Sequence, residues 1–153
     1  MFKAIIIGGT GATGKQLLNQ LISNQNCDLV TSIGRRPVLD GEKNDKLVDT
    51  VVESLFKLSS TEKHWKDNDV FFNCIGTTRQ RAGGPKEFIN VESGISNEAA
   101  KMAENAKIPH ASLISAKGAN HKIWAKDWIH PLLYMKTIGQ KEQTIISNFS
   151  FNK

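Results

Sequence analysis

Glycines recur near the amino terminus at a spacing that suits phosphate binding. Gly8, Gly11 and Gly14 stand three residues apart, and Gly9 gives a second pattern, G-x-G-x-x-G, with the last two. Glycine lets a backbone turn tightly and approach a ligand closely. A helix that follows such a loop points unpaired N–H groups and its positive dipole end at an anion. The candidate phosphate-binding residues are Gly8, Gly9, Thr10, Gly11, Ala12, Thr13 and Gly14.

The segments on either side of this loop must position it. An apolar run, residues 4–7, precedes the glycines, and an amphipathic stretch, residues 17–22, follows them. The order of strand, glycine loop and helix is that of the first βαβ unit of a dinucleotide-binding fold. A glycine-rich turn in another kind of α/β protein is the alternative, and the flanking strand and helix favour the dinucleotide site.

A second apolar run, residues 29–33, leads to the adjacent basic residues Arg35 and Arg36. In a dinucleotide-binding unit the end of the second strand meets the adenosine ribose, where an acidic residue binds a free 2′-hydroxyl and an arginine accommodates a 2′-phosphate. No carboxylate lies between residues 30 and 38. Guanidinium groups offer bidentate contacts to phosphate. The pair therefore predicts NADP(H) rather than NAD(H), with an exposed basic turn before Pro37 as the alternative.

Strand and helix patterns alternate along the rest of the chain. Alternation of this kind predicts an α/β fold with a doubly wound, mainly parallel Rossmann sheet and helices on both faces. No internal repeat or linker interrupts it, so residues 1–153 read as one domain. The further strands are expected at 47–52, 70–75, 111–114 and, as the start of a sixth, 148–151; the further helices are a short polar one containing Trp65 and two longer ones at 86–107 and 132–146.

Composition bounds the class of protein. The chain of 153 residues is long enough to form one hydrophobic core without disulfide bonds or bound metal ions to stabilise it. Cys27 and Cys74 lie far apart and the histidines form no ligand pattern, so we expect a reducing compartment and no metal site. No apolar run approaches the roughly 20 residues of a membrane span, and the first strand begins too early for a signal peptide. We expect a cytoplasmic protein, with the nucleus or an organelle interior as alternatives, and no membrane partner.

The charge balance raises the question of nucleic-acid binding. The formal net charge is +5 and the pI is about 9.3. The basic residues are scattered among fifteen acidic ones and form no run of the length that marks a nucleic-acid patch. A nucleic-acid partner is therefore disfavoured, and a phosphorylated cofactor accounts for the paired arginines more simply.

Five segments in this order resemble the atypical short-chain dehydrogenase/reductases, and within them the Tat-interacting-protein-type oxidoreductases. The matching segments are residues 8–14, 33–36, 75–79 with Ala82-Gly83, 115–119, and Leu133-Tyr134. The resemblance covers nearly the whole chain. It implies that the glycine loop with Thr10 and Thr13 holds the pyrophosphate and that Arg35 and Arg36 hold the 2′-phosphate of NADPH. It also implies that Ile75 and Gly76, with Thr77 after them, lie in the cofactor site against its adenosine side.

The resemblance implies a catalytic pair as well. Short-chain reductases use a tyrosine as general acid, a lysine four residues later on the same helix face, and a serine after the fifth strand. Tyr134 and Ser115 match the tyrosine and the serine, but Ile138 stands where the lysine belongs. Lys136 projects to another side of the helix and Lys141 lies about 10 Å further along, so neither is expected to replace it.

Two further departures bear on activity. Ala116 stands where the family often has a second serine, and relatives continue past a sixth strand with a substrate-shaping segment that this sequence, ending at Lys153, does not contain. We therefore keep two hypotheses: an NADPH-dependent reductase of a carbonyl substrate, and a catalytically idle NADP(H)-binding subunit of a larger assembly.

The segment before Tyr134 offers a protein-partner hypothesis. It carries Trp124 and Trp128, and large aromatic side chains concentrate binding energy at interfaces. The alternative is that both tryptophans simply pack onto the following helix.

Overall fold

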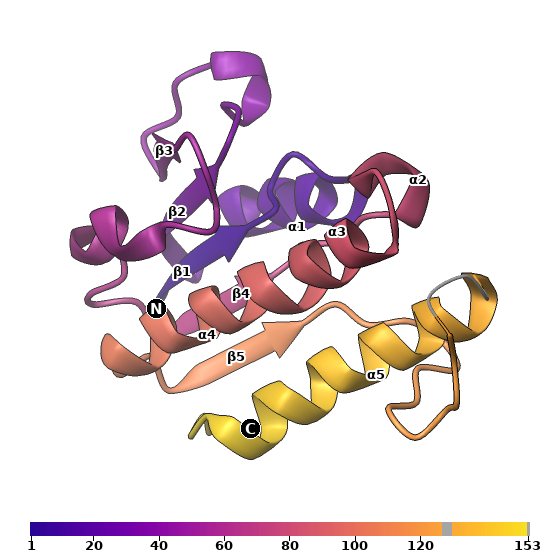
Figure 1. Cartoon of the computed structure of the whole chain (residues 1–153). Helices are drawn as coiled ribbons and strands as arrows, with labels where there is room; N and C mark the ends of the chain where they lie inside the picture. Colours follow the sequence, from indigo (N-terminus) through magenta and orange to yellow (C-terminus); the bar gives the residue numbers. More distant parts are fainter. Residues whose placement is uncertain (127–129, 153) are drawn as a thin grey trace.

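One parallel sheet of five strands forms the centre of the molecule (Figure 1). The computed structural model describes residues 1–126 and 130–152. The strands lie in the order β3-β2-β1-β4-β5. The chain moves outward from β1 to β3 and then crosses back to β4 on the other side of β1, so the predicted doubly wound fold is confirmed. The strands are β1 (Phe2–Ile7), β2 (Cys27–Gly34), β3 (Leu47–Val51), β4 (Val70–Asn73) and β5 (His110–Leu113).

Helices cover both faces of this sheet (Figure 1). Two of them, α1 and α4, lie on opposite faces because each packs against a different set of strand side chains. The α-helices are α1 (Ala12–Ser23), α2 (Arg79–Ala82), α3 (Pro85–Ile89), α4 (Ser96–Asn105) and α5 (His130–Asn148); the 3₁₀ segments are η1 (Leu39–Gly41) and η2 (Leu58–His64), and η3 (Asn90–Ile95) is a π-helix.

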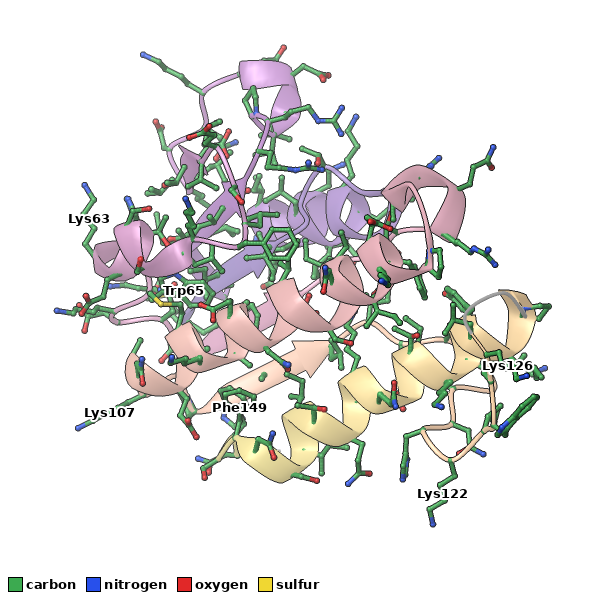
Figure 2. All side chains as sticks on the ribbon, in the orientation of Figure 1. Lys63, Trp65, Lys107, Lys122, Lys126 and Phe149 are labelled. Atoms are coloured by element: carbon green, nitrogen blue, oxygen red, sulfur yellow. The ribbon has the colours of Figure 1, made fainter. Side chains whose placement is uncertain are left out.

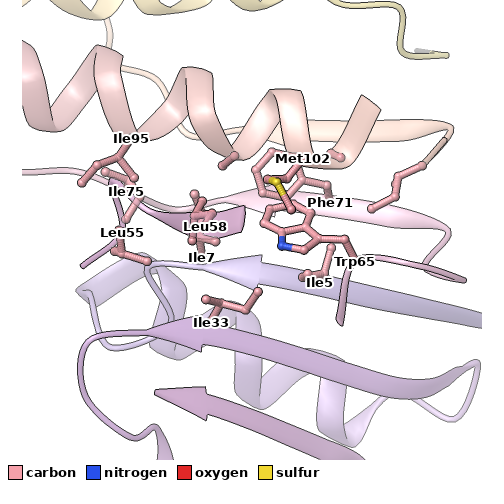
Figure 3. Packing of buried hydrophobic residues seen from close by; sticks show 13 residues of the cluster. Ile5, Ile7, Ile33, Leu55, Leu58, Trp65, Phe71, Ile75, Ile95 and Met102 are labelled. Atoms are coloured by element: carbon pink, nitrogen blue, oxygen red, sulfur yellow. The ribbon is translucent and has the colours of Figure 1, made fainter. Parts of the chain in front are cut away.

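Strand β1 supplies both halves of the core. Successive strand side chains point to opposite faces, so Ala4 and Ile6 pack toward α1 whereas Ile5 and Ile7 pack toward η2 and α4. Figure 3 shows the second group, in which Trp65 packs beside Phe71 with ring centroids 5.4 Å apart. Burying each large apolar side chain contributes about 1.5–3 kcal/mol. The core thereby fixes where the carboxyl ends of β1, β4 and β5 lie.

Three expected elements differ from the structure. The helix expected at 86–107 is a succession of α3, η3 and α4, because a π-turn interrupts it and inserts an extra residue. The expected polar helix is the 3₁₀ segment η2, and Trp65 follows it fully buried, with its indole N–H donating to Thr61 Oγ1 at 2.9 Å.

The expected sixth strand is the third difference. Helix α5 continues to Asn148, and the backbone N–H of Ser150 donates to Glu104 Oε1 at 2.9 Å rather than to the sheet. Asn152 makes an isolated parallel bridge to His110 at the edge of the sheet. No helix among residues 1–126 and 130–152 is long and apolar enough to cross a bilayer.

Candidate functional site: a crevice with two pockets

The glycine loop connects β1 to α1 at the switch point of the sheet. Gly8 has a φ of +82°, and a Cβ there would lie 2.6 Å from the carbonyl oxygen of Cys74. A Cβ at Gly14 would collide with the backbone of Gly8, so glycine at both positions lets β1, β4 and α1 meet closely. Gly11 is the N-cap of α1 and brings no side chain to cap it. The helix therefore offers free N–H groups to an anion, which fits a dinucleotide pyrophosphate.

One pocket lies between this loop and the end of β2, and we call it the Arg36 pocket. Its lining residues are Gly9, Thr10, Lys15, Arg36, Pro37, Val38, Leu39 and Asp40. In a doubly wound fold this side receives the adenosine ribose. Arg36 lines the pocket, and Arg35 is exposed beside it. Sequence reasoning missed Lys15, which directly follows the last glycine of the loop, and Asp40, which lies beyond the window searched for carboxylates.

A second pocket lies on the other side of the loop, beyond the ends of β4 and β5, and we call it the Tyr134 pocket. Its lining residues are 11–13, 74–78, Arg81, Glu92, Ile114, Ser115, Tyr134, Ile138 and Lys141. The structure thus brings the two candidate catalytic hydroxyls together with the glycine loop. Tyr134 is half-buried and stacks on Phe88 with ring centroids 5.9 Å apart, whereas Ser115 is exposed.

The segment Ile75, Gly76 and Thr77 lies in this second pocket. The resemblance placed the first two against the adenosine side, but here they share a pocket with Tyr134 rather than with Arg36. The physical reason is that β4 lies on the opposite side of β1 from β2.

A buried ion pair closes the floor of the Tyr134 pocket. Lys141 Nζ donates to Glu92 Oε2 at 3.0 Å and to the carbonyl oxygen of Ile75 at 2.9 Å. The other carboxylate oxygen of Glu92 accepts the backbone N–H of Thr77 at 2.7 Å. Both charged side chains are 1% exposed. The pair therefore fastens α5 and η3 to the turn that follows β4.

Lys141, which the sequence did not suggest as a replacement for the missing lysine, lines the pocket together with Tyr134. Seven residues make almost two full turns of an α-helix, so positions 134, 138 and 141 share one face. Helical side chains also tilt toward the amino terminus, which carries a long lysine side chain back toward the tyrosine end. The seven-residue spacing between Tyr134 and Lys141 was a signal in the sequence that both lie on one helix face. No such spacing points to Glu92, the partner of Lys141.

Cys74 lies where the two strands β1 and β4 end, and it lines the same pocket. Burial raises the pKa of its thiol, and the positive charge of Lys141 opposes that effect.

No group of three or more histidine, cysteine or acidic side chains within the described part of the chain could hold a metal ion.

The tryptophan segment is described only in part. Trp124 is 66% exposed, with Lys126 Nζ 5.8 Å from its ring centroid, whereas Trp128 lies outside the described residues. Figure 2 shows Lys122 and Lys126 at one side of the molecule, whereas Lys63 and Lys107 lie at the opposite side. The exposure of Trp124 leaves it accessible, and the partner remains a prediction.

Sequence comparisons link the chain to two groups of curated proteins, although no protein-family model matches it. It is 32% identical over 147 residues to FMP52, described as mitochondrial, of Meyerozyma guilliermondii, which is 95% of this chain and 59% of that protein. It is 31% identical over 140 residues to HTATIP2 of Rattus norvegicus, covering 92% of this chain and 54% of the relative. The chain thus spans a little over half the length of these relatives.

The expectation of a cytoplasmic protein is contradicted by these comparisons. The relatives named FMP52 are described as mitochondrial in several organisms, including Debaryomyces hansenii and Candida albicans. The expectation rested on the cysteine usage and on the lack of a signal-peptide or membrane-span pattern in the sequence, and none of these bears on import into an organelle.

Structural comparisons agree on the fold. The oxidoreductase ylbE of Lactococcus lactis matches with a TM-score of 0.72 at 18% identity, over 97% of this chain and 65% of that one. The UDP-glucose 4-epimerase of Bifidobacterium longum, solved with NAD⁺ and UDP, matches with a TM-score of 0.71 at 13% identity, over 94% of this chain and 48% of that one. With the motif order from Gly8 to Tyr134, these relatives and folds show that the chain belongs to the atypical short-chain dehydrogenase/reductases, a family of NAD(P)-binding Rossmann proteins.

Proposed function

We propose that this chain binds NADPH across the crevice and reduces a carbonyl substrate in the Tyr134 pocket. One observation carries the proposal: a single pocket collects Tyr134 and Ser115 with residues 11–13 of the glycine loop. A proton donor and a hydrogen-bond donor therefore stand beside the place where the fold directs a dinucleotide.

The residues of the pocket divide the chemistry between them. NADPH, when bound, supplies a hydride to the carbonyl carbon. The Ser115 hydroxyl donates a hydrogen bond to the carbonyl oxygen and orients it, and the Tyr134 hydroxyl donates the proton that this oxygen needs. Stacking on Phe88 restrains the tyrosine ring from one side.

The Arg36 pocket supports NADPH as the preferred cofactor. Lys15 and Arg36 place two positive charges on its lining, against the single carboxylate of Asp40. A 2′-phosphate carries nearly two negative charges and gains charge-assisted hydrogen bonds from such groups. Asp40 would favour a free 2′-hydroxyl instead, so the balance of these side chains sets the preference.

A specific observation favours the second function, an NADP(H)-binding protein without turnover. Ile138 is 4% exposed and presents an apolar side chain one turn after Tyr134, where a lysine would assist the tyrosine. In that case the protein would act through a partner, for which the exposed Trp124 is the candidate contact.

Activity and binding measured on matched variants separate the two functions. NADPH oxidation is followed with a panel of aldehydes and quinones for the wild-type chain and for Tyr134→Phe. We expect the variant to lose about 10²- to 10⁴-fold in rate while its NADPH affinity stays within twofold. No turnover in either protein despite NADPH binding would leave the non-catalytic function, and equal turnover in both would mean that Tyr134 is not the proton donor.

We also propose a mitochondrial location, which rests on the description of the FMP52 relatives. Fractionation of cells expressing the tagged chain tests it. Recovery with matrix or membrane markers of mitochondria is the expected result, and recovery in the cytosol alone would contradict it.

A further inference from the structure

The ammonium of Lys141 has a hydrogen-bonding capacity that the protein does not use up. A lysine ammonium has three N–H donors. The structure gives two of them partners, the carbonyl of Ile75 and the carboxylate of Glu92. The side chain is 1% exposed, yet it belongs to the lining of the Tyr134 pocket. Its remaining donor is thus available to a ligand that enters that pocket.

Stability alone does not explain this pair. Removing two charges from water costs about as much as their mutual attraction returns, and well-packed apolar side chains often replace such pairs without loss. The pair stands at the junction of three elements, η3, α5 and the turn after β4, and π-turns such as the one that carries Glu92 are frequent at functional sites. These contacts hold the ammonium at one fixed place on the pocket floor.

The place matches one part of a dinucleotide. The Arg36 pocket lies on the β2 side of the glycine loop and the Tyr134 pocket on the β4 side, so a dinucleotide with its pyrophosphate at the loop directs its nicotinamide ribose toward Lys141. Ribose hydroxyl oxygens accept hydrogen bonds, and a charged donor makes such a bond stronger. A lysine at position 138 would reach the same face, but Ile138 has no donor to offer.

We propose that Lys141 binds the ribose hydroxyls on the nicotinamide side of the cofactor and that Glu92 is the positioning residue that holds Lys141 there. This inference rests on the proposed binding of NADP(H) but not on turnover. It assigns to a lysine two turns after Tyr134 a contact that the residue one turn after Tyr134 cannot make.

Titration calorimetry with three ligands tests the assignment. NADPH and NADH both contain the nicotinamide ribose, whereas adenosine 2′,5′-bisphosphate contains only the adenosine half with its 2′-phosphate. The main variant is Glu92→Gln/Lys141→Met, which removes both charges and so leaves no unpaired ion buried. The control is Lys136→Met, the same substitution on the same helix at a residue outside the pocket lining.

The expected result is selective. The double variant should bind NADPH and NADH about tenfold more weakly or worse, the loss of one charged hydrogen bond, and should bind adenosine 2′,5′-bisphosphate as the wild type does. Lys136→Met should bind all three ligands as the wild type does. Should the double variant not fold, Glu92→Gln/Lys141→Leu, which also lacks a donor at position 141, serves in its place.

Two results would overturn the inference, and they differ from failure of the proposed function. Unchanged NADPH affinity in a folded double variant would remove Lys141 from the cofactor site while leaving cofactor binding intact. An equal loss for all three ligands would make the pair a support for the whole crevice rather than a ribose contact. If the wild-type chain binds none of the three, the proposed function itself fails.

Discussion

The two pockets of the crevice differ in where their charges lie. In the Arg36 pocket the charged side chains of Lys15, Arg36 and Asp40 are exposed. In the Tyr134 pocket the ion pair of Glu92 and Lys141 is buried and anchored to backbone groups. Exposed charges are screened by salt and rearrange easily, whereas a buried charge that is hydrogen-bonded to fixed backbone and side-chain groups is held in place. Under the proposed function, the first pocket would select the cofactor, and the second would hold the reacting groups in fixed positions.

Residues of the glycine loop line both pockets, so a substitution that distorts the loop should impair both pockets together. Gly14→Ala places a Cβ against the backbone of Gly8. We expect a loss of about 1–3 kcal/mol in the free energy of unfolding, as for other overpacked sites, together with loss of NADPH and NADH binding alike.

Thermal unfolding and calorimetry check this prediction, with Gly76→Ala as the matched control for stability. Nothing lies within 4 Å of a Cβ built at Gly76. Equal melting temperatures for the two variants would show that α1 does not pack against the loop as described.

The two pockets should respond differently to the substitution Ile138→Lys. The new ammonium would stand on the face shared by Tyr134 and Lys141, and a cation near the tyrosine favours proton transfer from its hydroxyl. We expect a several-fold rise in the NADPH oxidation rate with no change in affinity for adenosine 2′,5′-bisphosphate. A wild type that turns over well and a variant that gains nothing would mean that Lys141 already serves in this role.

Variants of the Arg36 pocket should change cofactor preference alone. Arg36→Ala should weaken NADPH binding by about tenfold and leave NADH unchanged, because only NADPH carries the 2′-phosphate. Asp40→Asn should shift the preference the other way by a smaller factor. Calorimetry at low and high salt sharpens the comparison, since the Arg36 effect should shrink with salt and the Lys141 effect should persist. Equal losses for NADH and NADPH in Arg36→Ala would contradict the assignment of this pocket.

The smallest expected effect is on the rate at which the Cys74 thiol is alkylated. Burial raises the pKa of Cys74 and Lys141 opposes the rise, so a smaller fraction is thiolate at neutral pH than in a free cysteine and alkylation should be slow, quickening as pH rises. In a Cys27→Ala background, bound NADPH should slow alkylation further, and Glu92→Gln/Lys141→Met should slow it because the cation that lowers the Cys74 pKa is gone. Mass spectrometry of timed alkylation reactions measures the rates. Faster alkylation of the folded double variant would contradict the placement of the ammonium near Cys74.

Local signals made the fold and the position of Arg36 after β2 predictable, although Lys15 and Asp40, which line the same pocket, were missed. The glycine spacing, the apolar run before it and the arginines after β2 all lie within the first βαβ unit. Each of these signals therefore comes from residues that are close together in the sequence. The Tyr134 pocket depends on contacts between distant segments: Glu92 lies 49 residues before Lys141, and the Ile75 carbonyl lies 66 residues before it. The π-turn that places Glu92 leaves no mark in a helical periodicity. The rise of about 10 Å from Tyr134 made Lys141 no obvious substitute in the sequence, although this lysine lines the pocket.

Calorimetric titration of the wild-type chain with NADPH and with NADH tests the central claim most directly, that the crevice is a nicotinamide-dinucleotide site with a preference set at Arg36. We predict one site per chain, with NADPH bound more tightly than NADH. Binding of neither nucleotide would contradict the claim and would mean that the fold serves another purpose.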